Sequence, residues 1–264
     1  MDSHSRWLLQ NNGEPAHALE LSDTTRPGVE QSLDFDHWRQ LGNQGWAWSD
    51  VLPYFKKAES WQGGASDIRG GDGPLSVSNT RFTHPIIDSW VEAATSTGYE
   101  TTADYNGAQQ DGVGYYQMTT RNGRRCSTAV AYLRPVRNRK NLDVITDAKV
   151  QCLRFDGRRT CGVSALVKGH PTTLTAKREV VLCAGAIASP RLLLLSRIGS
   201  LQGLVEHNIN VHHELPGVGE NLQDHLQARA VLKCQASTMN LEVDTLSQEA
   251  LVALRYALSR SGPM

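Results

Sequence analysis

The chain has 264 residues, 39% hydrophobic and 20% charged, which is typical of a globular protein with a sizeable core and excludes a disordered chain. Its 27 basic and 27 acidic residues cancel, so charge gives no basis for binding nucleic acid or an anionic membrane. The cysteines number 5 and are widely spaced, which argues against a disulfide framework and a zinc site. No apolar run is long enough to span a bilayer, and a cytoplasmic location is the default expectation.

The N-terminal part of the chain divides into two regions. Residues 1–32 show no sustained periodicity and contain several glycines and prolines, so we expect a poorly ordered leader. The folded region is expected to cover residues 33–264 and opens with a stretch rich in tryptophan. There, Ser49 is expected to cap a short helix that tolerates Pro53 in its first turn.

Three further helices are predicted from capping signals and apolar spacing. The segment from Pro85 to Gly98 has a proline near its start, a glycine at its end and apolar residues at helical spacing. A helix from Thr128 to Leu133 is expected to end at the proline two residues later. Near the C-terminus, Thr245 and Gln248 fit a capping box in front of a periodic apolar segment.

The hydrophobic period changes to two after residue 141. Three strands of an antiparallel meander are predicted, with residues 156–157 (Asp-Gly) as a hairpin turn, at Leu142–Thr146, Ala148–Phe155 and Thr160–Val167. A fourth strand, Glu179–Cys183, is apolar in its centre, which is typical of a strand covered on both faces in a parallel sheet.

That predicted strand leads into the turn Ala184–Ala186 and then into a predicted helix, Ser189–Ser196, with Ser189 as its cap and Pro190 at its first position. Small residues at the end of a parallel strand let a ligand approach the backbone beside a helix start. Close packing of a helix on a strand selects the same small residues, so both explanations remain open.

Other chemical motifs are weaker. There is no complete glycine-rich dinucleotide fingerprint, nucleophile elbow or H-E-x-x-H helix, and we predict no metal ligands. His225 directly follows Asp224, and this pair is one candidate for a general base oriented by a carboxylate. Adjacent residues seldom face each other, and we therefore favour a structural hydrogen bond for His225.

Four blocks of sequence, in order, resemble the glucose-methanol-choline (GMC) oxidoreductases. The first block comprises DFDHW, LGNQGW and DVLPYFKK, and the second matches the N-G-x-R-x-S and A-Y-L elements. The third is similar to the second sequence signature of the family and the fourth to the loop that follows it. The blocks lie at residues 34–57, 122–133, 185–199 and 215–225. Within the family they most resemble the choline-dehydrogenase-like members.

The resemblance implies a mixed α/β fold: part of a doubly wound FAD-binding domain with an antiparallel β-meander, and part of a second, substrate-binding domain whose segments interleave with it. It implies oxidation of a small-molecule alcohol by hydride transfer to the flavin. The matching positions place Val150 on the adenine side of FAD, with Ala184 and Gly185 lining the cofactor.

Some elements of the family pattern have no match in this sequence. The glycine-rich turn that holds the FAD diphosphate is absent from residues 1–32, and the family's catalytic histidine belongs to a C-terminal third beyond residue 264, so no catalytic residue is assigned. Arg197 stands where the family usually has glycine. The alternative hypothesis is therefore a truncated, inactive remnant or an incomplete gene model, and the polypeptide alone is expected to bind FAD weakly.

Overall fold

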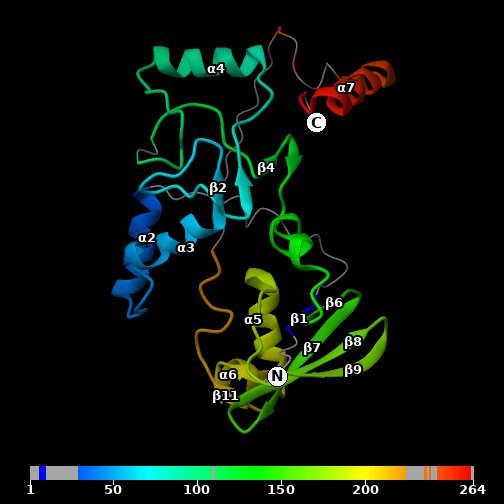
Figure 1. Ribbon diagram of the computed structural model, residues 1–264. Helices are drawn as coiled ribbons and strands as arrows, with labels where there is room; N and C mark the ends of the chain where they lie inside the picture. The colour runs from blue at the N-terminus through cyan, green and yellow to red at the C-terminus, as the bar shows by residue number, and fades with distance from the viewer. Residues whose placement is uncertain are drawn as a thin grey trace. The chain divides into compact units, whose positions relative to one another are not determined.

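The computed structural model describes residues 6–9, 29–108, 111–223, 235–236, 238 and 243–262. The chain forms two compact units whose segments alternate along the sequence (Figure 1). Unit 1 comprises Met1–His17 and Asn138–Val231, and unit 2 comprises Ala18–Arg137 and Leu232–Met264. No helix within the described ranges combines the length and the apolar character needed to cross a membrane.

Unit 1 is built on a three-stranded antiparallel sheet in the order β7-β8-β9 (Figure 1). Its strands are β7 (Ala148–Asp156), β8 (Arg159–Val167) and β9 (His170–Thr175). The hairpin predicted at residues 156–157 is confirmed: Asp156 pairs with Arg159, and Gly157 takes a left-handed φ of +56° that favours glycine. Val163 and Ala165, which alternate along β8, are buried at the centre of that strand.

The set of strands predicted to form the meander is wrong: the first predicted strand is not part of it, and a strand that was not predicted is. The strand β6 (Leu142–Ile145) pairs in parallel with β1 (Arg6–Leu9), which lies inside the region expected to be a leader, and not with β7. The third meander strand is instead β9, which the sequence did not reveal. Its residues HPTTLT include Pro171 and little apolar surface, because β9 is an edge strand whose outer side needs no partner.

The predicted buried strand Glu179–Cys183 is wrong. These residues pair with none of the described strands, and the Val181 side chain is 71% exposed. An apolar run becomes a buried strand only where neighbouring strands supply backbone partners, and none of the described strands flanks this segment. Val180 and Leu182 instead pack against a core formed by Leu153, Val163 and Leu192.

The helix after this segment, α5 (Gly185–Leu195), begins four residues earlier than predicted. Its N-cap is Ala184, and Ser189 lies within the helix, where its Oγ accepts a hydrogen bond of 3.1 Å from the Ala184 backbone N–H. Pro190 also lies inside the helix rather than at its first position. The predictions of Ser189 as the cap and of Pro190 at the first helical position are therefore wrong, although a helix does follow the Ala184 turn.

The remaining part of unit 1 follows α5. A short parallel pair joins β10 (Ile198–Gly199) to β11 (His213–Glu214), and α6 (Leu201–Glu206) lies between them in sequence. Ser200 caps α6 by accepting a hydrogen bond of 3.2 Å from the Gly203 backbone N–H.

Unit 2 is made of short elements joined by long loops (Figure 1). β2 and β3 form a parallel pair, and β4 and β5 an antiparallel one. The elements are α2 (Val29–Gln40), α3 (Trp48–Ala58), β2 (Glu59–Trp61), β3 (Leu75–Val77), α4 (Pro85–Ser96), β4 (Thr120–Arg121), β5 (Arg124–Arg125), the π-helix η1 (Ala129–Leu133), the 3₁₀ turn η2 (Arg134–Val136) and α7 (Leu246–Ser259).

Most helix starts of unit 2 agree with the sequence. The predicted capping box of α7 is confirmed, with Thr245 Oγ1 accepting from the Gln248 backbone and Gln248 Oε1 accepting from the Thr245 backbone. At α4, the cap is His84, whose Nδ1 accepts from Ile86. The prediction of Ser49 as a cap is wrong: α3 starts after Ala47, whose backbone N–H donates to the carboxylate three residues on. The short helix near residue 130 continues past Leu133 as η2, because proline is tolerated in the first turn of a new helical segment.

Candidate functional site

The three residues predicted to line a cofactor all belong to unit 1. Ala184 is the N-cap of α5 and Gly185 its first residue, so most of the predicted turn, Ala184–Ala186, is the first turn of the helix. Gly185 has a φ of +86°, a left-handed conformation that side chains with a Cβ rarely adopt. Val150 lies on β7, where it pairs with Ala165 of β8.

The start of α5 has the donor chemistry that a bound FAD needs. The first turn of a helix carries backbone N–H groups without intrahelical acceptors. Ala184 and Ala186 are exposed and Gly185 is half-buried, and none has a side chain larger than a methyl group. A ligand can therefore approach the backbone directly, and this turn fits a polar part of the cofactor.

Val150 belongs to the face of the sheet that α5 covers. Its side chain is partly buried and packs against the core of Leu153, Val163 and Leu192, and the last of these is a residue of α5. Val150 and the helix that begins at Gly185 are thus joined by one hydrophobic cluster. The assignment of Val150 to the adenine side of FAD remains a prediction.

A buried hydroxyl that the sequence did not single out connects the same two elements. The Leu153 backbone N–H on β7 donates to Ser196 Oγ at 2.7 Å, and Ser196 Oγ donates to the Leu192 carbonyl at 2.6 Å. Ser196 is the C-cap of α5 and is 3% exposed. Its position at the end of a predicted helix gave no signal, because the partner on β7 is 43 residues away.

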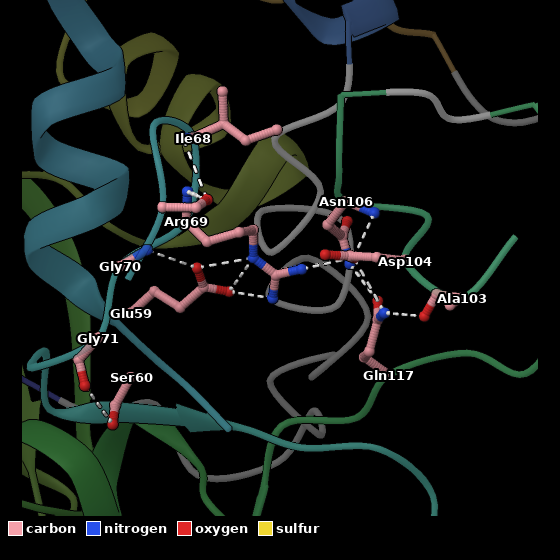
Figure 2. Close-up of polar contacts among 11 residues, drawn as sticks. Glu59, Ser60, Ile68, Arg69, Gly70, Gly71, Ala103, Asp104, Asn106 and Gln117 are labelled. Atoms are coloured by element: carbon pink, nitrogen blue, oxygen red, sulfur yellow. Dashed lines mark hydrogen bonds and ion pairs between the residues drawn. The ribbon is translucent and has the colours of Figure 1, made fainter. Parts of the chain in front are cut away.

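Unit 2 contains a buried ionic network centred on Arg69 (Figure 2). Arg69 Nε lies 2.9 Å from Glu59 Oε2 and Arg69 Nη2 lies 2.6 Å from Glu59 Oε1. On its other side, Arg69 Nη1 contacts Asp104 Oδ1 at 2.6 Å, and the guanidinium lies 4.4 Å from the centre of the Trp61 ring. Arg69 therefore joins β2 to a loop that is distant in the sequence.

The network continues through amide side chains (Figure 2). Asp104 Oδ1 also accepts from the Asn106 backbone and from Gln117 Nε2, each at 2.9 Å, and Asn106 Nδ2 donates to Gln117 Oε1 at 2.7 Å. Asn106 Oδ1 is buried without a partner among the described atoms. The fork of Arg69 is fully engaged by carboxylates, which suits a structural role better than substrate binding.

Three of the histidines that the structure describes have structural contacts. His84 caps α4, and His212 stacks on Phe155 with ring centres 4.4 Å apart. His213 pairs in β11, whereas His225 lies outside the described residues, as does Cys234.

Three tyrosines have a raised pKa. A hydrogen bond to Asp88 raises the pKa of Tyr115, and burial raises the pKa of Tyr105 and Tyr132. Each phenol is therefore protonated near neutral pH and does not act as a base. Within the described ranges, no three side chains of His, Cys, Asp or Glu gather as metal ligands.

An open hollow of about 590 Å³ lies beside α6. Its walls contain none of the residues predicted to line a cofactor, and consist of Ser200, Leu201, Gln202, Val205, Glu206 and Glu214.

Comparison with known proteins identifies the fold. The GMC oxidoreductase family model matches residues 30–227. Oxygen-dependent choline dehydrogenase of Brucella suis biovar 1 is 41% identical over 232 residues, covering 88% of this chain and 42% of that protein. Pyridoxine 4-oxidase from Mesorbium loti aligns over 74% of this chain and 38% of its own, with a TM-score of 0.69 and 32% identity. An FAD-dependent oxidoreductase from Chaetomium thermophilum aligns over 87% and 43%, with a TM-score of 0.76 and 27% identity.

The chain belongs to the GMC oxidoreductase family, because the family model covers most of its length. The resemblance found in the sequence is thereby confirmed, and so is the fold class, a mixed helix and strand fold with part of an FAD-binding domain. FAD is the cofactor that this family membership implies. The chain spans 42% of the length of the choline dehydrogenase to which it is similar.

Proposed function

We propose that the chain is part of an FAD-dependent oxidoreductase that oxidises the CH–OH group of a small alcohol, in the manner of a choline dehydrogenase. The observation that carries this proposal is the 41% identity to oxygen-dependent choline dehydrogenase over 88% of the chain. FAD, when bound, supplies the acceptor for the hydride that leaves the alcohol carbon.

In this proposal, unit 1 of the chain helps to bind the cofactor. Ala184 is exposed and Gly185 half-buried, and their small size lets the cofactor approach the backbone at the start of α5, while Val150 supplies apolar contact from strand β7. None of the residues of this chain is proposed to take the hydroxyl proton of the substrate. The comparisons do not favour the alternative hypothesis, an inactive remnant, over this function.

The proposal is tested on the protein as its source produces it. We expect the purified protein to carry FAD and to show the visible absorption of an oxidised flavin. Anaerobic addition of choline, or of a simple primary alcohol, is expected to bleach that absorption, while the corresponding aldehyde is expected to leave it unchanged. A purified protein that carries no flavin, or a flavin that none of these alcohols reduces, would contradict the proposed function.

A further inference from the structure

We propose that Ser196 is a positioning residue of the cofactor site, which holds α5 in a fixed register on strand β7. This inference rests on the proposed function, since the residues that it positions are Val150, Ala184 and Gly185. Ser196 itself lies at the opposite end of α5, about 16 Å from Gly185 by the rise of an 11-residue helix.

The local structure of β7 creates the need for an acceptor at this point. The pairing of β7 with β8 shifts register between Val150 and Cys152, and β7 is one of the two edge strands of its sheet. The N–H of Leu153 is therefore not satisfied by the sheet, and Leu153 is only 8% exposed. A buried donor without an acceptor is costly, and Ser196 Oγ removes that cost.

The hydroxyl of Ser196 has one proton, which it donates to the Leu192 carbonyl. Because the Oγ donates to the Leu192 carbonyl, its lone pairs face the Leu153 N–H. Leu192 and Leu153 also belong to one hydrophobic cluster. The polar bridge and this cluster both join α5 to β7, which fixes the rotation of α5 and its position along β7.

The consequence for the site follows from the geometry of a rigid helix. Val150 packs into the cluster that contains Leu153 and Leu192, while Gly185 begins the helix that Ser196 ends. A change in the tilt of α5 at Ser196 moves the start of the helix relative to Val150. The separation between the two proposed cofactor contacts therefore depends on Ser196, although its side chain is buried and touches no ligand.

The test compares Ser196→Ala with Ser200→Ala in the whole protein. Both changes remove a side-chain hydrogen bond to a backbone N–H in unit 1, but Ser200 caps α6 and does not bridge α5 to β7. We expect Ser196→Ala to raise the Kd for FAD about tenfold. It should also shift the visible spectrum of the bound flavin and speed deuterium exchange at the Leu153 amide. Ser200→Ala is expected to lower thermal stability and leave the Kd and spectrum unchanged.

A second pair of variants covers the case in which Ser196→Ala does not fold. Ser196→Thr and Ser196→Val have nearly the same shape but differ in the hydroxyl, so we expect tighter FAD binding in the Thr variant. Equal Kd values in this pair, or an unchanged Kd in Ser196→Ala, would overturn the positioning role while leaving the proposed function intact. A wild-type protein that binds no FAD would overturn the proposed function and this role together.

Discussion

Arg69 and Glu59 form a buried two-point ion pair, in which the Nε–Oε2 and Nη2–Oε1 distances are 2.9 and 2.6 Å. Their side chains are 2% and 10% exposed. The planar guanidinium also binds Asp104 while it holds both oxygens of Glu59. The ammonium group of a lysine, a compact point charge, does not reproduce this geometry. This relationship explains how β2 is fastened to the loop around residue 104.

Arg69→Lys is expected to lower the free energy of unfolding by about 3 kcal/mol, because it leaves buried carboxylate oxygens without donors. Denaturant titration measures the change. The matched control is Arg121→Lys, since Arg121 is exposed and makes one hydrogen bond to a backbone carbonyl in the same unit; about 0.5 kcal/mol or less is expected there. Equal losses in the two variants would show that the network does not stabilise unit 2.

Arg197→Gly is expected to raise stability by about 1 kcal/mol, because Arg197 has a φ of +68° and glycine adopts this conformation without a steric penalty. Thermal unfolding provides the measurement. Asn208→Gly is the control: Asn208 has a φ of +56°, but asparagine tolerates that region and the gain should be smaller. A lower melting temperature for Arg197→Gly would mean that contacts of the arginine outweigh the backbone strain.

Gly185→Ala is expected to weaken FAD binding in the protein that carries this chain. Gly185 has a left-handed φ that alanine adopts only with strain, so the substitution distorts the backbone at the proposed contact. Gly157→Ala is the matched control. It introduces comparable strain at a φ of +56° in the β7–β8 turn, where the new methyl group has open space. Isothermal titration of the apoprotein with FAD compares the two, and a similar loss of affinity in both would remove Gly185 from the site.

Asp88→Asn is expected to lower the pKa of Tyr115. The phenol donates a hydrogen bond of 2.5 Å to Asp88 Oδ1, and this bond and the negative charge of the carboxylate favour the protonated phenol. The wild-type residue should therefore lose its proton at a higher pH than an ordinary tyrosine, and the variant at a lower pH than the wild type. NMR titration of a ring-labelled sample measures both, and identical titration curves would exclude the interaction in solution.

The structural features that could be predicted from the sequence are those that depend on residues close together in the chain. The capping box at Thr245 and the hairpin at Gly157 were found because their signals span four residues or fewer. The family blocks likewise identified the fold class, which the family match confirms.

The failures concern partners that are distant in the chain. Apolar continuity at Glu179–Cys183 predicted a buried strand, but such a strand depends on flanking strands that a local pattern does not contain. The contacts of Arg69 with Asp104 and of Ser196 with Leu153 cross 35 and 43 residues, and no motif in the sequence announces them.

The outer strand β9 determines how this sheet meets other molecules. The unpaired backbone groups of an exposed strand edge can pair with a strand of another chain, and such pairing leads to aggregation. In β9, Pro171 offers no backbone N–H, and the residues that alternate with its partly buried Thr172 and Leu174 are exposed. This edge of the sheet is therefore protected from growth by strand addition during folding, and replacing Pro171 with valine would give the protein a longer edge on which to self-associate.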